Sequence, residues 1–288
     1  MPVTRLLAVI NGEPESAAVA KMAVELGEKR PTLIDGLHVH SDRELVSWAG
    51  SPLYAGPMPA EVIAQLKRQQ DERRADAHRI FLDATTGLPV AGCTGMPDMR
   101  TTSARWLDMR GDPWRTISEK GRMRDLTLVA RPTPEHWESE SRAVEAALFE
   151  SGRAVLVVPQ TESQVPRSHI AVAWANTPEC ARSIWAAEPF LRDAERVSLI
   201  VISKGDVDHA ALDDVNEYFH HKGIDFEILH QSHNGHSTSG QILDCVEELD
   251  AGLLVMGAYG HSRLREMVLG GATRGVLRAS PVPVLMAH

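Results

Sequence analysis

The residues of this chain with the clearest chemical potential lie in LLVMGAYGHSRLREMVLGGATRGVLRASPVPVLMAH, which begins at Leu253. A buried strand is predicted to end at Gly257, and Gly260 follows in a turn. After nine intervening residues, Gly270 and Gly271 open the last helix. Glycines let a backbone approach a pyrophosphate closely because no Cβ stands in the way. A helix N-terminus adds unpaired N–H groups and a favourable dipole. The pattern therefore predicts two donor-rich loops that face one phosphate chain.

The elements that must position this motif occur twice. RLLAVINGEPESA at 5–17 aligns without gaps on HIAVAWANTPECA at 169–181, at a spacing of 164 residues. Each copy reads as an apolar strand, a small polar turn, Pro-Glu and a helix. The later strands and helices keep the same order in the segments 104–130 and 226–257, and in the closing strands 153–159 and 282–288. An internal repeat of this length predicts two copies of one folding unit.

The order of the elements predicts the fold class. In each half, strands at 6–10 and 32–38, or at 170–174 and 197–202, alternate with helices of about 10 to 15 residues. Such alternation indicates right-handed crossovers and a parallel sheet covered on both faces. We predict an α/β protein with two doubly wound, five-stranded parallel-sheet domains. The first domain is assigned to 1–160 and the second to 168–288, joined by the polar, proline-containing linker 160–167.

Composition and charge exclude several classes of protein. The formal net charge of -9, without a Lys/Arg-rich stripe, argues against nucleic acid as a partner. Three widely spaced cysteines fit thiols in a reducing compartment, so a cytoplasmic location is expected. The apolar run 6–10 is too short for a signal-peptide core and is predicted to be a strand. No apolar run approaches the roughly 18 to 20 residues of a membrane helix, so no membrane association is expected.

The first half carries an extra stretch, at about 41–95. Its Gly/Pro-rich part, 49–59, is predicted to be a loop. The charged segment 60–85 has apolar residues at helical spacing and predicts a long, solvent-facing helix. An elongated crossover helix is favoured over a partner-binding arm. Further along, Gly111-Asp112-Pro113 predicts the start of a helix capped by Asp112.

Other candidate residues have weaker patterns. His230, His233 and His236 are spaced three apart, as metal ligands on one helix face would be, but Asn234-Gly235 favours an exposed loop at the rim of the crevice. Trp174 ends a strand beside the crevice, where it could stack on a base or simply pack. No Ser/His/Asp triad can be assembled, so hydrolase chemistry is not supported.

The glycine motif closely resembles that of universal stress proteins, whose nucleotide-binding members carry G-x2-G-x9-G-(S/T) between the fourth and fifth strands. Because the resemblance extends over both halves, it implies a tandem universal stress protein. It implies the strand order 3-2-1-4-5 of adenine nucleotide alpha hydrolase-like folds. It also implies ATP or a related adenine nucleotide as ligand, with or without Mg²⁺. The last strands of the two domains would pair antiparallel as an intramolecular pseudo-dimer, and a further homodimer is conceivable.

This sequence departs from the family pattern at two side-chain contacts. The Ser or Thr expected after the third glycine is Gly271, although Thr273 follows two residues later. The acidic residue expected at the end of the first strand is Ala175 in the second half and Asn11 in the first. Nucleotide binding in the second half would therefore depend mainly on backbone amides.

The first half lacks the motif altogether. Its corresponding segment, LVARPTPEHWESESRAVEAAL at 128–148, has no glycine pair and places Pro132 and Pro134 in the loop. Proline removes N–H donors. The glutamates of this segment would repel phosphates; they are Glu135, Glu138, Glu140 and Glu145. We expect this half not to bind ATP in the family's way and to serve a structural role or hold a different ligand.

The leading hypothesis is a stress-response protein that binds an ATP-like nucleotide in its C-terminal domain, beside a structural N-terminal domain. The residues expected to form the site are Trp174, Ala175, Met256, Gly257, Gly260, His261, Arg263, Gly270, Gly271, Ala272 and Thr273. A ligand-free interaction module, in which the glycines serve only as turns, is one alternative. A slow ATPase is another, and it needs a carboxylate for Mg²⁺ that Ala175 does not supply.

Overall fold

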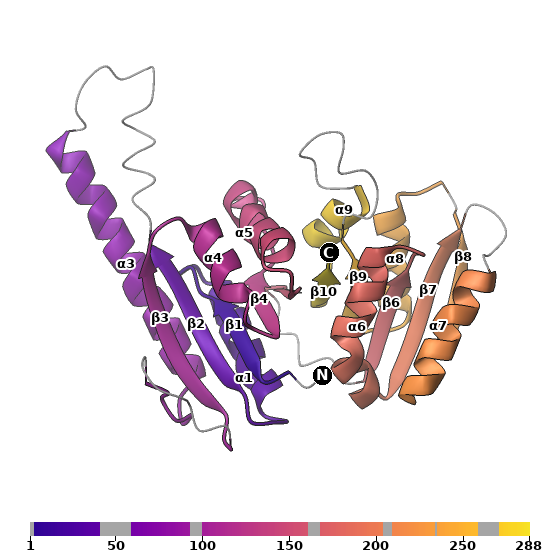
Figure 1. Cartoon of the computed structure of the whole chain (residues 1–288). Coiled ribbons are helices and arrows are strands. Elements are labelled where there is room, and N and C mark those ends of the chain that lie inside the picture. Colours follow the sequence, from indigo (N-terminus) through magenta and orange to yellow (C-terminus); the bar gives the residue numbers. More distant parts are fainter. Residues whose placement is uncertain are drawn as a thin grey trace.

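The chain forms one ten-stranded sheet with helices on both faces, as the computed structural model shows (Figure 1). The structure describes residues 3–40, 59–92, 100–160, 168–203, 209–233, 235–258 and 271–288. The strands of the first half are β1 (Arg5–Val9), β2 (Leu33–His40), β3 (Ser103–Arg110), β4 (Leu126–Ala130) and β5 (Ala154–Val158). Those of the second half are β6 (His169–Trp174), β7 (Arg196–Ser203), β8 (Glu227–Ser232), β9 (Leu253–Gly257) and β10 (Val284–Ala287).

Helices connect these strands within each half. The first half contains α1 (Ser16–Gly27), α3 (Ala60–Ala84), α4 (Pro113–Gly121) and α5 (Trp137–Glu150). The second half contains α6 (Pro178–Asp193), α7 (His209–Lys222), α8 (Thr238–Glu248) and α9 (Gly271–Ala279). Within the described ranges, every helix is too short or too polar to cross a bilayer.

The strand order confirms the predicted fold class. The sheet runs β3-β2-β1-β4-β5-β10-β9-β6-β7-β8, so each half has the order 3-2-1-4-5. Strands within a half are parallel. The two halves meet where β5 and β10 pair antiparallel, with Leu156 opposite Leu285. This is the pairing of last strands expected from the family resemblance. The linker predicted at 160–167 lies outside the described residues except for Gln160.

Alternation along the strands builds two apolar layers, one on each face of the sheet. On β1, Leu6 and Ala8 are fully buried against the layer that contains α1, α3, α6 and α7. Leu7 is fully buried in the opposite layer, with α4, α5, α8 and α9. A strand buried on both faces reads as a continuous apolar run because successive side chains point in opposite directions.

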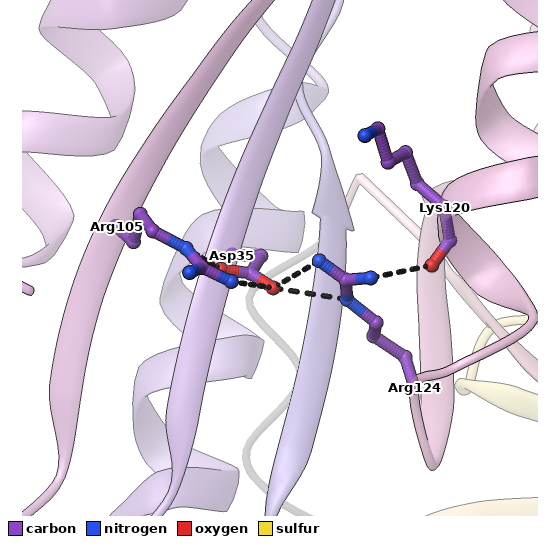
Figure 2. A network of polar contacts seen from close by, with 4 residues as sticks. All are labelled: Asp35, Arg105, Lys120 and Arg124. Carbon is purple, nitrogen blue, oxygen red and sulfur yellow. Dashed lines mark hydrogen bonds and ion pairs between the residues drawn. The ribbon is translucent and has the colours of Figure 1, made fainter. Parts of the chain in front are cut away.

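A buried ion network ties β2 and β3 of the first half to the turn after α4 (Figure 2). Asp35 on β2 is fully buried and lies opposite Arg105 of β3 in the sheet register. Its carboxylate accepts hydrogen bonds from Arg105 Nε at 2.6 Å and from Arg124 Nη2 at 2.6 Å. Arg124, in the turn after α4, also donates through Nη1 to the carbonyl of Lys120 at 3.0 Å. Two guanidinium groups offset the cost of removing the carboxylate from water.

The long charged segment of the first half is α3, as predicted. Its N-terminal part extends past the edge of the sheet (Figure 1). Within this helix only Ala77 and Phe81 are buried, whereas Leu82, an apolar residue of the predicted stripe, is 49% exposed. Phe81 packs directly on Gly36 of β2, where a Cβ would lie 2.5 Å from the ring. The helix is therefore anchored near its C-terminal end. Most of the predicted loop at 49–59 lies outside the described residues.

The predicted helix cap at Asp112 is confirmed, whereas the exposed loop predicted for the three spaced histidines is corrected in part, because His230 lies in a strand. Asp112 caps α4 by accepting a hydrogen bond from the N–H of Arg115 at 3.0 Å. In the second half, His230 belongs to β8 and its Nε2 lies 2.9 Å from the hydroxyl of Ser203. His233 follows this strand, where its Nδ1 accepts from the N–H of Gly235. The three spaced histidines therefore do not share a helix.

Candidate functional site

The predicted crevice of the second half lies between β6 and β9. These neighbours run parallel, with Ala173 beside Met256, and end at Trp174 and Gly257. After β6 the chain continues to β7 on one side, and after β9 it continues to β10 on the other side. The gap between β6 and β9 is therefore the topological switch point of this half. In open α/β sheets ligands bind at the carboxyl ends of the strands at such a point. Two helices begin at this edge, α6 and α9.

The structure places seven of the eleven predicted site residues. Gly260, His261, Arg263 and Gly270 lie outside the described residues. Trp174 is half-buried and packs against the core layer of α6, and Ala175 is exposed. At the other side of the crevice, the side chain of Met256 is buried in the core. Gly271 is exposed, Ala272 is half-buried and Thr273 is buried in the first turn of α9.

Gly257 has a packing role that the sequence analysis did not foresee. A Cβ at this position would lie 2.6 Å from the backbone nitrogen of Cys180, in the first turn of α6. Glycine is therefore required for the start of α6 to pack on the end of β9. The neighbouring Ser183 supports the same contact. Its hydroxyl accepts from the Ala287 N–H at 2.9 Å and lies 2.8 Å from the Met256 carbonyl oxygen.

The start of α9 offers backbone donors. Among the described residues, no atom lies within 4 Å of the place where a Cβ of Gly271 would stand. The N–H groups of the first helical turn have no partner inside the helix, and the helix dipole makes this end attractive to an anion. The turn is thus shaped to receive an anion close to the backbone.

Residues of the first half hold α9 from its side. The guanidinium groups of Arg274 and Arg278 lie 5.7 and 4.8 Å from the ring centre of Trp137, the first residue of α5. Arg131, in the loop after β4, donates through Nη1 to the carbonyl of Arg278 at 2.9 Å. The helix that follows the glycine motif is therefore braced by the other half of the chain. Sequence analysis missed these contacts because they join residues more than 130 positions apart.

A second crevice lies at the equivalent edge of the first half, where β1, β2 and β4 end. It encloses a cavity of about 380 Å³. Its floor is apolar and includes Val9, Ile10, Leu37, Val39, Ile117 and Val129. Its more polar walls include His38, His40, Trp114, His136, Glu13 and Glu140. This volume is within the range of ordinary small-molecule sites.

Hydrogen bonds hold the side chains of His38 and Asn11 in place at this crevice. His38 is buried and its Nδ1 lies 2.9 Å from the Ile10 carbonyl oxygen. Burial lowers the pKa of His38, so the ring is neutral, with Nδ1 as donor and Nε2 as acceptor. Asn11 stands where the family carries an acid. Its Oδ1 accepts from the Glu13 N–H at 3.0 Å and from the Ser16 hydroxyl.

The loop after β4 is hydrogen-bonded to the carboxylate of Glu140 in α5. Glu140 Oε2 accepts from the backbone N–H of Thr133 at 2.7 Å and lies 3.1 Å from the Thr133 hydroxyl. The side chain is buried, and this burial raises the pKa of the carboxyl against the opposing effect of the Thr133 hydrogen bonds. The amide that could meet a phosphate in this half is thus already paired. That this half does not bind a nucleotide in the family's way stays a prediction.

Comparison with known proteins finds relatives of this chain both by sequence and by fold. The class defined by the fold is a tandem, doubly wound α/β protein with a switch point in each half and a cavity at that of the first half. Residues 211–288, which include the glycine motif, match the sequence model of the universal stress protein family. Universal stress proteins of Mycobacterium bovis and Mycobacterium tuberculosis are 39% identical to this chain over 62 residues, which is 22% of this chain and 20% of each relative. The matched segment thus spans about a fifth of those relatives.

The solved structures extend the likeness to the whole chain. A universal stress protein from Archaeoglobus fulgidus superposes with a TM-score of 0.70 at 17% identity, covering 98% of this chain and 95% of that one. A protein of unknown function from Pseudomonas aeruginosa gives 0.57 at 14% identity, with 98% and 92% covered. The resemblance to universal stress proteins is thus confirmed by sequence over 211–288, and the solved structures show the same fold over the whole chain.

Proposed function

We propose that the second half binds an adenine nucleotide, ATP or a close relative, at the carboxyl edge of β6 and β9. The observation that carries the proposal is the open first turn of α9 at Gly271, at the sheet edge where β9 ends. Backbone amides in this position suit a phosphate. The family match over 211–288 supports it, because the matched segment contains the motif. The nucleotide would tune a partner interaction in a stress response.

Calorimetric titration with ATP, AMP and GTP tests this proposal. Wild-type protein should bind ATP and discriminate against GTP. Gly271→Asp should weaken ATP binding about tenfold or more, because the new carboxylate would stand close to the phosphates. No atom of the described residues lies within 4 Å of the new Cβ, so the described part of the fold should tolerate it. Ala60→Asp adds the same charge at the exposed first residue of α3 and is the matched control. Equal ATP affinity in both variants would overturn the proposal.

A ligand-free interaction module is the second candidate. It is favoured by one observation: the clash that a Cβ at Gly257 would make with Cys180 explains this glycine by packing alone. Under this reading no nucleotide would give measurable heat in the wild-type titration. The same experiment therefore separates the two candidates.

Mg²⁺ and ATP hydrolysis call for a carboxylate near the phosphates. Glu179 lies in the first turn of α6, beside Gly257, and its Oε2 is buried with no hydrogen-bond partner in the described part of the chain. If this group helps to hold a metal, Glu179→Gln should abolish any dependence of ATP binding on added Mg²⁺. Phosphate release no faster than that of a protein blank would exclude the slow ATPase.

A further inference from the structure

The crevice of the first half has the character of a site for an apolar ring. Side chains of Leu37, Ile117 and Val129 contribute to its floor, and the indole of Trp114 lines its wall. The guanidinium of Arg142 lies 3.9 Å from the centre of that indole. Apolar cavities with a few well-placed polar groups are the usual form of small-molecule sites. The crevice can therefore enclose an aromatic group.

Glu140, a residue of the crevice lining, has a buried oxygen that lacks a partner in the described residues. Glu140 is only 7% exposed, and its Oε2 is used by Thr133. Its Oε1 is buried and has no hydrogen-bond partner in the described residues. A buried carboxylate oxygen without a donor is costly. A ligand that brings an N–H group, above all a cationic one, would remove this cost.

The charges of the crevice favour a cation over an anion. Glu13 and Glu140 both line it. The Arg73 guanidinium, which also lines it, has its Nε 3.6 Å from the Glu13 carboxylate. Arg74 is engaged with Asp108, outside the cavity lining. An anionic group entering the crevice would therefore approach two carboxylates whose nearest lining guanidinium is already paired.

We propose that the first-half crevice binds a small aromatic amine, with its ring on the apolar floor and its ammonium group on the carboxylate of Glu140. The ring would be removed from water by the floor and Trp114. The ammonium would pair with the carboxylate of Glu140, whose side chain must turn toward the cavity to expose its buried oxygen. This ligand is positively charged, whereas a nucleotide is negatively charged. The two halves of the chain would therefore bind molecules of opposite charge.

Three indole derivatives test the proposal without any variant. Tryptamine carries an ammonium, tryptophol a hydroxyl and indole-3-acetate a carboxylate on the same ring. Calorimetry or ligand-observed NMR near neutral pH should rank them tryptamine, tryptophol, indole-3-acetate, with tryptamine at least tenfold tighter than indole-3-acetate. Equal affinity for all three, tighter binding of the acid, or no binding of tryptamine would overturn the proposal.

Matched variants locate the binding. Glu140→Gln keeps the size of the side chain and removes its charge, so it should weaken tryptamine about tenfold and leave tryptophol little changed. Glu138→Gln removes the same charge from an exposed position of α5 and should change neither. Ala143→Phe, at a residue that lines the cavity, should exclude all three probes. Far-ultraviolet circular dichroism checks that each variant is folded. Tryptamine binding that survives both Glu140→Gln and Ala143→Phe would contradict the site.

The test is independent of the proposed nucleotide site. Gly271→Asp should weaken ATP and leave tryptamine affinity unchanged, whereas Glu140→Gln should do the reverse. Failure of ATP to bind would remove the proposed function and leave this inference standing. Displacement of tryptamine by equimolar ATP would show that the two share one site and would overturn the inference.

Discussion

The carboxylate of Asp35 and the guanidinium of Arg124 form two hydrogen bonds, 2.9 and 2.6 Å long, in the interior of the first half. Arg124→Ala would leave the fully buried carboxylate with Arg105 as its remaining partner. We expect a loss of about 3 to 5 kcal/mol in the free energy of unfolding, measured by urea denaturation. Arg122→Ala, at an exposed arginine two residues earlier, should cost less than about 1 kcal/mol. Similar losses in both variants would show that the buried pair contributes little.

Gly257 should tolerate no side chain. In Gly257→Ala the new Cβ would meet the backbone nitrogen of Cys180 at 2.6 Å, so α6 or β9 must shift. We expect a loss of about 1 to 3 kcal/mol, the usual cost of overpacking. In the part of the chain that the structure describes, the Cβ of Gly271→Ala meets no atom within 4 Å, so this variant should be neutral or slightly stabilising. Thermal unfolding of the two variants measures the difference, and equal melting temperatures would contradict the close contact.

His38 should make stability depend on pH. Burial is the largest cause of its lowered pKa, His40 and Arg74 add to it, and the Ile10 carbonyl and Asp108 oppose it. Because the folded pKa lies below the ordinary 6.5, the unfolded chain takes up the proton first as the pH falls. The contribution of neutral His38 is complete above pH 6.5 and is lost as the pH drops through the folded pKa.

The pH dependence can be assigned with one substitution. His38→Asn can still donate to the Ile10 carbonyl but does not titrate. Urea midpoints from about pH 7.5 down to about pH 5 should fall more steeply for wild-type protein than for the variant. Parallel curves would mean that His38 contributes nothing to the pH dependence.

The bracing of α9 by α5 should matter for nucleotide binding. Trp137→Ala removes the ring that both Arg274 and Arg278 approach. We expect ATP affinity to fall several-fold, since one or two cation–π contacts of about 0.5 to 1 kcal/mol each help to hold the helix that presents the amides. Trp185→Ala, at a 68% exposed tryptophan of α6, is the control. The expectation fails if calorimetry gives both variants the wild-type affinity.

The order of the elements, the α/β class and the two-fold repeat could be read from the sequence. Their signals are local: alternation buries Leu6 and Leu7 on opposite faces, and the cap at Asp112 depends on residues within one turn. The glycine spacing also predicts which loop and helix would face a ligand, and this part stays a prediction. Such features depend on neighbouring residues, so no knowledge of packing is needed to predict them.

Only the tertiary structure decided which distant residues meet. Asp35 pairs with Arg124 from 89 positions away, Trp137 meets α9 across the two halves, and Glu140 is a buried residue of a cavity lining rather than a surface group that repels a phosphate. The sequence suggested that Gly257 leaves room for a ligand. The structure shows that glycine is needed there because the start of α6 packs against it. Contacts of this kind depend on how side chains from separate elements fill space together, and periodicity along the chain carries no record of that packing.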